Sequence, residues 1–201
     1  MGMRKGELTH QTILETAIRL ASRVGLQGLS IGGLAEELSL SKSGLFAHFK
    51  SKTELQVQVL QTATEVFTER VVRPALTRPR GEPRVRALFE GWLTWDRDKL
   101  LEGGCIFVAA AAELDDAPGP ARDTLVQSQR DWLDCLAQAA RIAVTEGHFR
   151  KDVDVEQFAH DEYAVMLGFH HAQRLMKDPR AETRARRAFD ALLAAARNPS
   201  T

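Results

Sequence analysis

Apolar residues recur at helical spacing along almost the whole chain, and no segment alternates between apolar and polar residues as a half-buried strand would. One apolar stripe covers residues 13–24 and is followed by Gly25, a residue type that often ends helices in the left-handed conformation. A second stripe over residues 55–71 predicts a long helix that begins at Lys52 and ends near Pro74. The pattern therefore predicts an all-α protein.

The rest of the chain predicts five further helices, separated by loops rich in proline, glycine and charged residues. A loop is expected over residues 77–83, and the helices are expected over residues 85–103, 105–114, 122–147, 154–176 and from Asp178 onward. Asp154 with Gln157, and Asp178 with Pro179, are residue pairs typical of helix starts.

Residues 30–55 predict two short helices joined by a tight turn, followed by the start of the long helix. Ser41 is a natural N-cap, because its hydroxyl can accept a hydrogen bond from the exposed amides of the helix it starts. Ser51 and Glu54 have the spacing of a capping box, which places the first residue of the long helix at Lys52. A helix of two turns between two caps is not stable alone, so this segment must fold as a packed unit.

Leu45 and Phe49 lie four residues apart in this segment and are expected to face the core of the packed unit. The other side of the same short helix would then face outward, with Lys42, Ser43, Gly44, Ala47 and His48. This arrangement is a helix-turn-helix, whose second helix enters the major groove of DNA. The segment therefore predicts DNA binding.

The order of residues here also resembles the signature of the TetR family of bacterial transcriptional regulators. The shared elements are an apolar pair, a turn, a serine-started helix with a central glycine, and a serine-lysine pair that opens the next helix. They appear as Leu34-Ala35, Ser39-Leu40-Ser41, Gly44-Leu45-Phe46-Ala47-His48-Phe49 and Ser51-Lys52-Thr53-Glu54-Leu55. With the amphipathic helix before it, the resemblance covers about a quarter of the chain.

Two positions depart from the family pattern. Phe46 stands where the family has a tyrosine, so the ring is kept but a hydroxyl that family members offer to a phosphate is lost. Ser39 stands where the family has the glycine of the turn, and it must adopt a conformation that glycine reaches at lower cost.

In this family the recognition helix reads bases while its flanks hold phosphates, and the resemblance implies the same roles here. Ser30, His48 and Lys52 match phosphate-binding positions, and Lys52 adds its charge to that of a helix N-terminus. Lys42 and Ser43 match base-reading positions. Considered alone, either lysine would be interpreted as a solvated side chain. The predicted DNA-binding residues are Ser30, Ser41, Lys42, Ser43, Gly44, Phe46, His48 and Lys52.

The resemblance also implies that residues 1–52 form a DNA-binding domain and residues 53–201 a domain that binds an effector and dimerises. Most aromatic residues fall on the helices that line the effector cavity in the family, and the predicted ligand-binding residues are Phe89, Trp92, Trp95, Phe107, Trp132, Tyr163, Phe169 and His170. Mostly apolar walls with a few polar groups suit a hydrophobic or aromatic ligand. The alternative is that these side chains simply form the core.

The last two helices are apolar around so much of their circumference that they need cover on two sides. Packing within the chain would cover one side, and a second copy across a two-fold axis would cover the other. This pattern predicts a homodimer, with an interface that includes Phe158, Val165, Met166, Ala172, Phe189 and Leu192. The alternative is that both helices belong to the core of a monomer.

Charge and composition change this interpretation little. Lys+Arg and Asp+Glu both number 27, so the net charge is zero, whereas a nonspecific nucleic-acid coat protein would be strongly basic. The chain has no run of about 18 apolar residues and no hydrophobic signal core, so we expect a cytoplasmic protein with no membrane partner. Cys105 and Cys135 lie among apolar residues and are expected to be buried free thiols.

No catalytic or metal-binding pattern stands out. The sequence has no nucleophile elbow, P-loop, dinucleotide fingerprint or zinc-protease motif. His160 and His171 share a helix face but would lie about 16 Å apart, so a single ion could not bind both. We therefore expect no enzymatic activity, no metal and no cofactor.

Together these patterns predict a repressor that binds a palindromic operator in double-stranded DNA as a homodimer. A small and hydrophobic effector of unknown identity would release it. The alternatives are a helical ligand-binding or interaction protein, an activator, and a regulator that needs no effector.

Overall fold

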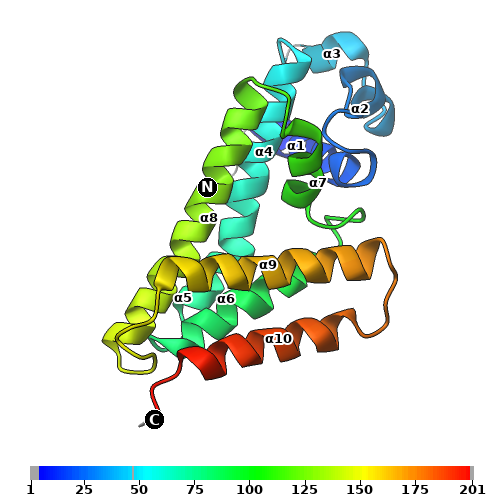
Figure 1. Cartoon of the computed structure of the whole chain (residues 1–201). Coiled ribbons are helices and arrows are strands. Elements are labelled where there is room, and N and C mark those ends of the chain that lie inside the picture. Colours follow the sequence, from blue (N-terminus) through cyan, green and yellow to red (C-terminus); the bar gives the residue numbers. More distant parts are fainter. Residues whose placement is uncertain (1–4, 47, 200–201) are drawn as a thin grey trace. The chain divides into compact units, whose positions relative to one another are not determined.

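The computed structural model describes residues 5–46 and 48–199, and these residues form an all-α chain, as expected (Figure 1). The helices are α1 (Lys5–Val24), α2 (Ile31–Glu37), α3 (Lys42–Phe46), α4 (Lys52–Phe67), the π-helical turn η1 (Thr68–Val72), α5 (Arg73–Leu76), α6 (Glu82–Trp95), α7 (Ile106–Leu114), α8 (Pro120–Thr145), α9 (Val155–Arg174) and α10 (Ala181–Ala196). An isolated antiparallel bridge joins Phe149 and Arg197. No helix in this part of the chain is long and apolar enough to cross a membrane.

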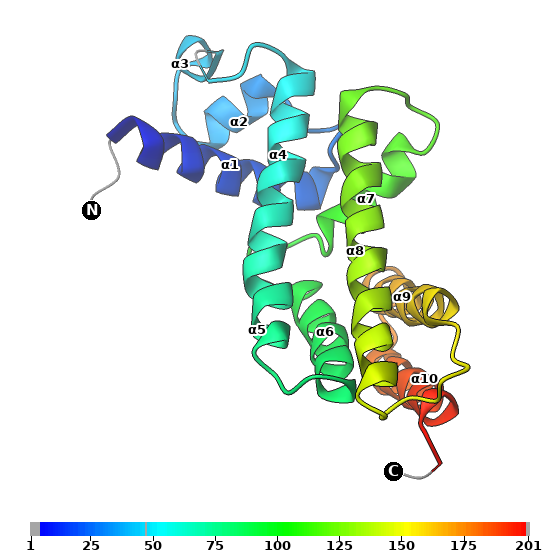
Figure 2. The same cartoon turned by 90° about the vertical axis from the view of Figure 1, so that its left-hand side faces the viewer.

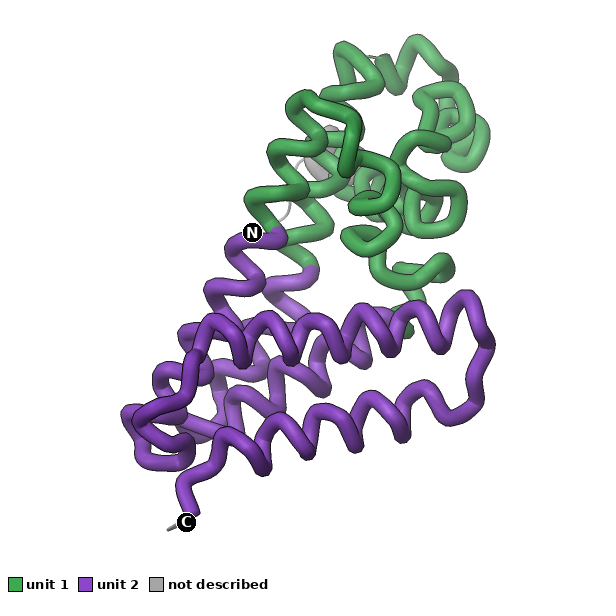
Figure 3. The backbone as a smooth tube through the Cα atoms, viewed as in Figure 1, with its two compact units in different colours: residues 1–66, 97–128 green, residues 67–96, 129–201 purple. Residues whose placement is uncertain are grey.

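The chain packs into two compact units, neither of which is a single continuous segment (Figure 3). Unit 1 contains residues 1–66 and 97–128, and unit 2 contains residues 67–96 and 129–201. The predicted division of the chain into a DNA-binding domain and an effector-binding domain at residue 52 is a division by function and not by packing. It stays a prediction.

In unit 1, α2 and α3 lie near the N-terminal end of α4 (Figure 2). The apolar stripe of α1 is buried, with Ile13, Ala17 and Ile18 at most 1% exposed. Gly25 ends α1 with φ at +81°, the left-handed conformation expected from the sequence. A buried amide then ties α4 to this region, because Gln56 Nε2 donates to the carbonyl of Leu26 over 2.9 Å.

The segment around α7 also packs against the C-terminal end of α1. The carboxylate of Glu113 accepts a hydrogen bond of 2.6 Å from the backbone amide of Gln27. The amide of Gly103 donates to the hydroxyl of Ser22 over 3.1 Å, and an added Cβ at Gly103 would lie 1.5 Å from the Ser22 carbonyl oxygen. Residues 97–128 are therefore structural partners of the N-terminal helices.

The long helix that begins at Lys52 runs to Leu76 and contains one π-helical turn. The backbone amide of Arg73 bonds to the carbonyl of Thr68, which is the spacing of a π-helix. Pro74 follows immediately and has no amide hydrogen, and in a regular α-helix its ring would clash with the carbonyl four residues earlier. A widened turn relieves that clash, so the helix continues two residues past its predicted end near Pro74.

Three other helix boundaries differ by three residues or more from those predicted. The helix expected to reach Gly103 ends at Trp95, and a turn follows in which Asp98 Oδ1 accepts from the amide of Leu100 over 2.8 Å. The loop expected through Pro83 is shorter because α6 begins at Glu82. The last helix begins at Ala181. At the start of α9, Asp154 accepts from the Gln157 amide over 2.9 Å, as the sequence predicted.

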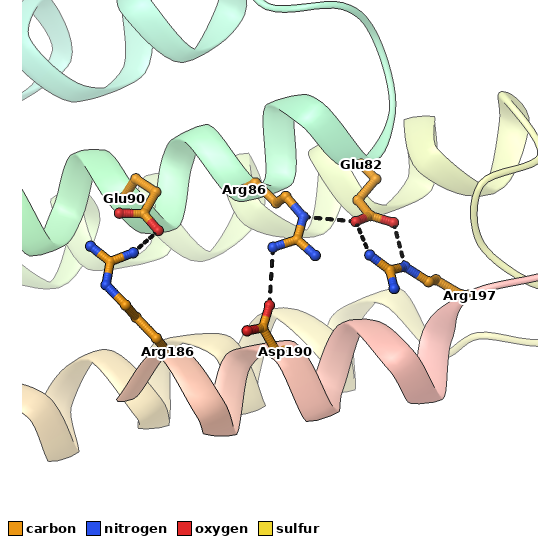
Figure 4. A network of polar contacts seen from close by, with 6 residues as sticks. All are labelled: Glu82, Arg86, Glu90, Arg186, Asp190 and Arg197. Atoms are coloured by element: carbon orange, nitrogen blue, oxygen red, sulfur yellow. Dashed lines mark hydrogen bonds and ion pairs between the residues drawn. The ribbon is translucent and has the colours of Figure 1, made fainter. Parts of the chain in front are cut away.

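In unit 2, α9 and α10 run side by side (Figure 1), and α6 is joined to α10 by both rings and charges. The rings of Phe89 and Phe189 stack with centroids 3.9 Å apart. A charged network, drawn in Figure 4, links the same helices and consists of Glu82, Arg86, Glu90, Arg186, Asp190 and Arg197.

The central residue of this network is Glu82. Its carboxylate accepts two hydrogen bonds from Arg197, of 2.7 Å and 2.9 Å, and one of 2.8 Å from Arg86 Nε. Arg86 also bonds to Asp190 over 3.0 Å. The hydrogen bonds from Arg197 and Arg86 lower the pKa of Glu82 from 4.5 to about 2 against the opposing effect of burial.

Candidate nucleic-acid interface

Serine hydroxyls cap each of the three helices that form the helix-turn-helix region. Ser30 Oγ accepts from the amide of Gly33 over 3.0 Å at the start of α2. Ser41 Oγ accepts from the amide of Gly44 over 3.1 Å at the start of α3, and Ser51 Oγ accepts from the amide of Glu54 over 3.1 Å at the start of α4. Because each cap satisfies an amide that the helix leaves free, these residues fix where the short helices begin.

The turn between α2 and α3 has the conformation that the sequence required of Ser39. Its φ is +54°, in the left-handed region that glycine adopts at lower cost. The amide of Leu40 bonds back to the carbonyl of Ala35 over 2.9 Å, which closes the turn. Ser39 therefore holds a strained backbone in the connection that orients α3.

Buried apolar side chains support α3 from behind. Leu34, Leu45 and Phe49 have no exposed surface. Phe49 also packs against the ring of His10 from α1, with centroids 5.5 Å apart. A five-residue helix is therefore held by tertiary packing rather than by its own length.

The side of α3 away from this core is open to solvent. Phe46 is 54% exposed, and the other predicted DNA-binding residues that are exposed are Ser30, Ser41, Lys42, Ser43, Gly44 and Lys52. Ala47, predicted to face outward, lies outside the described residues.

Three of the predicted contacts already have neighbours within the chain. His48 is half-buried, and its ring lies 5.6 Å from that of His10 between centroids. The ammonium group of Lys52 donates to the carbonyl of Gln27, which uses one of its three hydrogens. Lys42 extends over Gly32, where a small surface hollow of about 550 Å³ separates α3 from the start of α2.

Comparison with known proteins gives two family matches. The family described as "Bacterial regulatory proteins, tetR family" matches residues 13–59, and "Tetracyclin repressor-like, C-terminal domain" matches residues 81–189, more than half of the chain. The chain belongs to the TetR family. A search of curated proteins finds no match.

Solved TetR-family structures share the fold. A TetR regulator from Chloroflexus aurantiacus is 24% identical, with a TM-score of 0.84 and 96% of each chain covered. A regulator from Saccharomonospora viridis in complex with choline is 22% identical, with a TM-score of 0.81 and coverage of 96% of this chain and 99% of that one. AibR, in complex with isovaleryl coenzyme A and operator DNA, is 23% identical, with a TM-score of 0.70 and coverage of 93% and 97%.

Most of the aromatic residues predicted to line a TetR-family effector site pack against other rings. Trp92 meets Phe169 with centroids 6.4 Å apart. Phe67, which sequence reasoning missed, lies between Trp95 and Trp132, with centroid distances of 5.3 Å and 4.9 Å. Phe89 is stacked on Phe189. Of the eight predicted ligand-binding residues, Phe107 is buried in unit 1, whereas the other seven belong to unit 2.

The two polar members of this set have polar partners. The hydroxyl of Tyr163 donates to Gln129 Oε1, which joins α9 to α8. His170 Nδ1 lies 2.6 Å from Oδ1 of the buried Asp96. These contacts account for polar groups that the sequence had suggested as ligand contacts, and neither partner was predicted.

The dimer interface predicted on α9 and α10 stays a prediction, and its six residues differ in their exposure within the single chain. Phe158, Met166 and Phe189 are buried within the single chain, where Phe158 packs against Phe149 with centroids 5.2 Å apart. Val165, Ala172 and Leu192 are half-buried. The three buried side chains form the core of the protomer because their own helices and neighbours cover them. The exposed positions of the two helices include Ala164, Leu167, Gly168, His171, Ala188, Ala191 and Ala195.

Both cysteines are free thiols. Cys105 is buried, as expected, whereas Cys135 is only half-buried. Among the residues that the structure describes, no three histidine, cysteine, aspartate or glutamate side chains form a group that could hold a metal ion.

Proposed function

We propose that this TetR-family protein is a repressor that binds a palindromic operator as a homodimer, with residues 1–52 contacting DNA and residues 53–201 binding an effector and dimerising. The observation that carries the proposal is the solvent-facing α3, with Lys42 and Ser43 exposed over the buried pair Leu45 and Phe49. A recognition helix must offer polar side chains to the groove while its other face is held rigidly.

The roles at the DNA follow from charge and position. Lys42 and Ser43 read base edges, since lysine can donate to the acceptor atoms of guanine. Ser30, His48 and Lys52 contact phosphates, which positions the protein without reading sequence. Gly44 lets the backbone of α3 approach the groove closely.

The exposed small residues of α9 and α10 support the homodimer. On α9 the exposed positions Ala164, Leu167, Gly168 and His171 recur at spacings of three and four, so they share one helix face. Binding to a palindromic operator requires the two copies of α3 to reach successive major grooves, about 34–36 Å apart.

The effector in this proposal is a small and largely hydrophobic molecule that binds the domain formed by residues 53–201. The complexes of AibR with isovaleryl coenzyme A and of the Saccharomonospora viridis regulator with choline support a ligand-responsive domain in residues 53–201. Release requires the effector to bind the DNA-incompetent state more tightly than the competent one. An operator-binding protein of this kind acts on chromosomal DNA in the cytoplasm.

Selection from random duplexes tests the proposal most directly. The full chain is incubated with a pool of random double-stranded DNA, bound duplexes are recovered over several rounds, and affinity is then measured against salt. We expect enrichment of a palindromic sequence. Recovery of no common sequence would overturn operator recognition and favour a helical interaction protein.

A further inference from the structure

Glu162, on α9, is buried without any visible compensation for its carboxyl group. It has no exposed surface, and neither oxygen has a hydrogen-bond partner within residues 5–46 and 48–199. Burial raises its pKa well above the usual range. Buried polar groups nearly always have a partner, and an unpartnered carboxyl group weakens the fold that contains it.

A second unpartnered group lies on α8. The indole Nε1–H of Trp132 is buried and has no hydrogen-bond acceptor in the described part of the chain. Cys135, one turn further along, lies close enough to Glu162 that burial first and the charge of that carboxylate second raise the pKa of its thiol. The bond between Tyr163 and Gln129 joins α9 to α8 at the same level.

These residues define a polar seam inside an apolar part of unit 2: Glu162 and Tyr163 on α9, and Gln129, Trp132 and Cys135 on α8. Within the seam, the side chains of Tyr163 and Gln129 are hydrogen-bonded to each other, whereas the carboxyl group of Glu162 and the indole N–H of Trp132 have no hydrogen-bond partner in the described residues. A structural core gains nothing from leaving these two groups unsatisfied. A binding site gains from the unpartnered carboxyl group of Glu162, because a ligand then supplies its missing partner and is selected by it.

We propose that Glu162 binds the charged nitrogen of an organic cation, so that the effector of this protein is an amine with an apolar body. The assignment rests on the proposed function, in which the body binds an effector. A carboxyl group in an apolar interior ionises most readily against a partner of opposite charge, whereas an anionic ligand would disfavour its ionisation further. Tryptophan is also the ring that attracts cations best, which suits the position of Trp132.

Three probes that share a phenylalkyl scaffold and differ in their head group test this inference: phenylbutylamine with a cationic head group, phenylbutanol with a neutral one and phenylbutyrate with an anionic one. Their affinities for the full-length protein are measured by isothermal titration calorimetry at neutral pH. The amine should bind about tenfold or more tightly than the alcohol, the factor expected for a charge-assisted hydrogen bond. The carboxylate should bind more weakly than the alcohol.

Glu162→Gln keeps the size of the side chain but cannot carry a charge, so it should reduce the preference for the amine to less than about threefold. Circular dichroism checks that the variant is folded, and Glu162→Met serves as a second variant if it is not. Asp161→Asn is the matched control, because Asp161 lies on the same helix and is bonded to Gln157 over 2.8 Å. The control should keep the preference of the wild type.

The inference is overturned if the wild type shows no preference for the amine, including the case in which no probe binds. It is also overturned if Glu162→Gln keeps the preference or if Asp161→Asn loses it. The operator selection described above is independent of these probes. Enrichment of a palindrome together with no amine preference would remove only the role of Glu162, whereas no enrichment would remove the proposed function itself.

Discussion

Replacing Glu82 with glutamine should destabilise the protein near neutral pH and remove part of its pH dependence. Glu82 is the acceptor at the centre of the network between α6 and α10, and its side chain is only 15% exposed. Since its pKa is lowered from 4.5 to about 2, the ionised form is favoured by folding. The stabilisation is therefore present above the unfolded-state pKa and is lost as the pH falls toward 2.

The magnitude follows from that difference in pKa. A fall from 4.5 to about 2 corresponds to at most ~3 kcal/mol. The side chains of Arg86 and Arg197 are 41% and 47% exposed, so solvent screens the interaction. We therefore expect Glu82→Gln to lower the free energy of unfolding by about 1–2 kcal/mol at pH 7.

The assay is urea unfolding followed by circular dichroism at pH 7 and pH 3, at one fixed protein concentration because a dimer's stability depends on concentration. The difference between wild type and Glu82→Gln should shrink at the lower pH, where Glu82 of the unfolded wild type is protonated. Glu90→Gln is the control in the same network, because Glu90 is 47% exposed and its pair with Arg186 should contribute less than about 0.5 kcal/mol. Equal stability of wild type and Glu82→Gln at pH 7, or an unchanged difference at pH 3, would refute the reasoning.

Three further predictions concern the DNA-binding helices and the dimer. Ser39→Gly should raise the free energy of unfolding by about 0.5–1 kcal/mol, because φ of +54° is left-handed, and a lower melting temperature would contradict this. Lys52→Ala should weaken binding to all duplexes and lower the slope of log affinity against log salt concentration by about one, whereas Lys42→Ala should relax the preference at one base pair at a cost of ~1–3 kcal/mol. Fluorescence anisotropy measured against salt concentration and DNA sequence separates the two effects. An unchanged slope for Lys52→Ala would exclude its phosphate contact. Leu167→Glu should shift the protein toward monomer in analytical ultracentrifugation, since a charge would enter the exposed stripe of α9, and an unaffected dimer would place the interface elsewhere.

The helix-turn-helix could be predicted in detail because its signals are local. Ser41 and Ser51 cap the helices that they precede, and each bond spans only three residues. The left-handed turn at Ser39 was expected from the resemblance, because Ser39 stands where the TetR family has the glycine of the turn. Contacts of this range depend on sequence spacing, which can be read directly.

The features that sequence reasoning missed depend on distant partners. The carboxylate of Glu113 accepts a hydrogen bond from the amide of Gln27, 86 residues away, and nothing near Glu113 in the sequence indicates that partner. Phe189 was placed at a dimer interface because its helix is apolar on several sides, yet the ring stacks on Phe89 in the same chain. Periodicity shows that a residue is apolar on a given face, but not which neighbour covers it.

The same reasoning applies to Glu162. Glu162 directly follows another acidic residue, Asp161, on α9 and gives no signal of its own in the sequence. Only the structure shows that both of its carboxyl oxygens are buried without a hydrogen-bond partner in the described residues. Its proposed role could not have been derived from a motif.

The contacts from Gly103 and Glu113 to the end of α1 set a condition for protein engineering. A chimera that transplants only the first 52 residues onto another regulator would leave the Gln27 amide without its carboxylate and expose the surface that Gly103 covers. A transplanted DNA-binding domain must therefore include residues 97–128, or the recipient protein must supply a glycine and an acidic side chain at the equivalent positions.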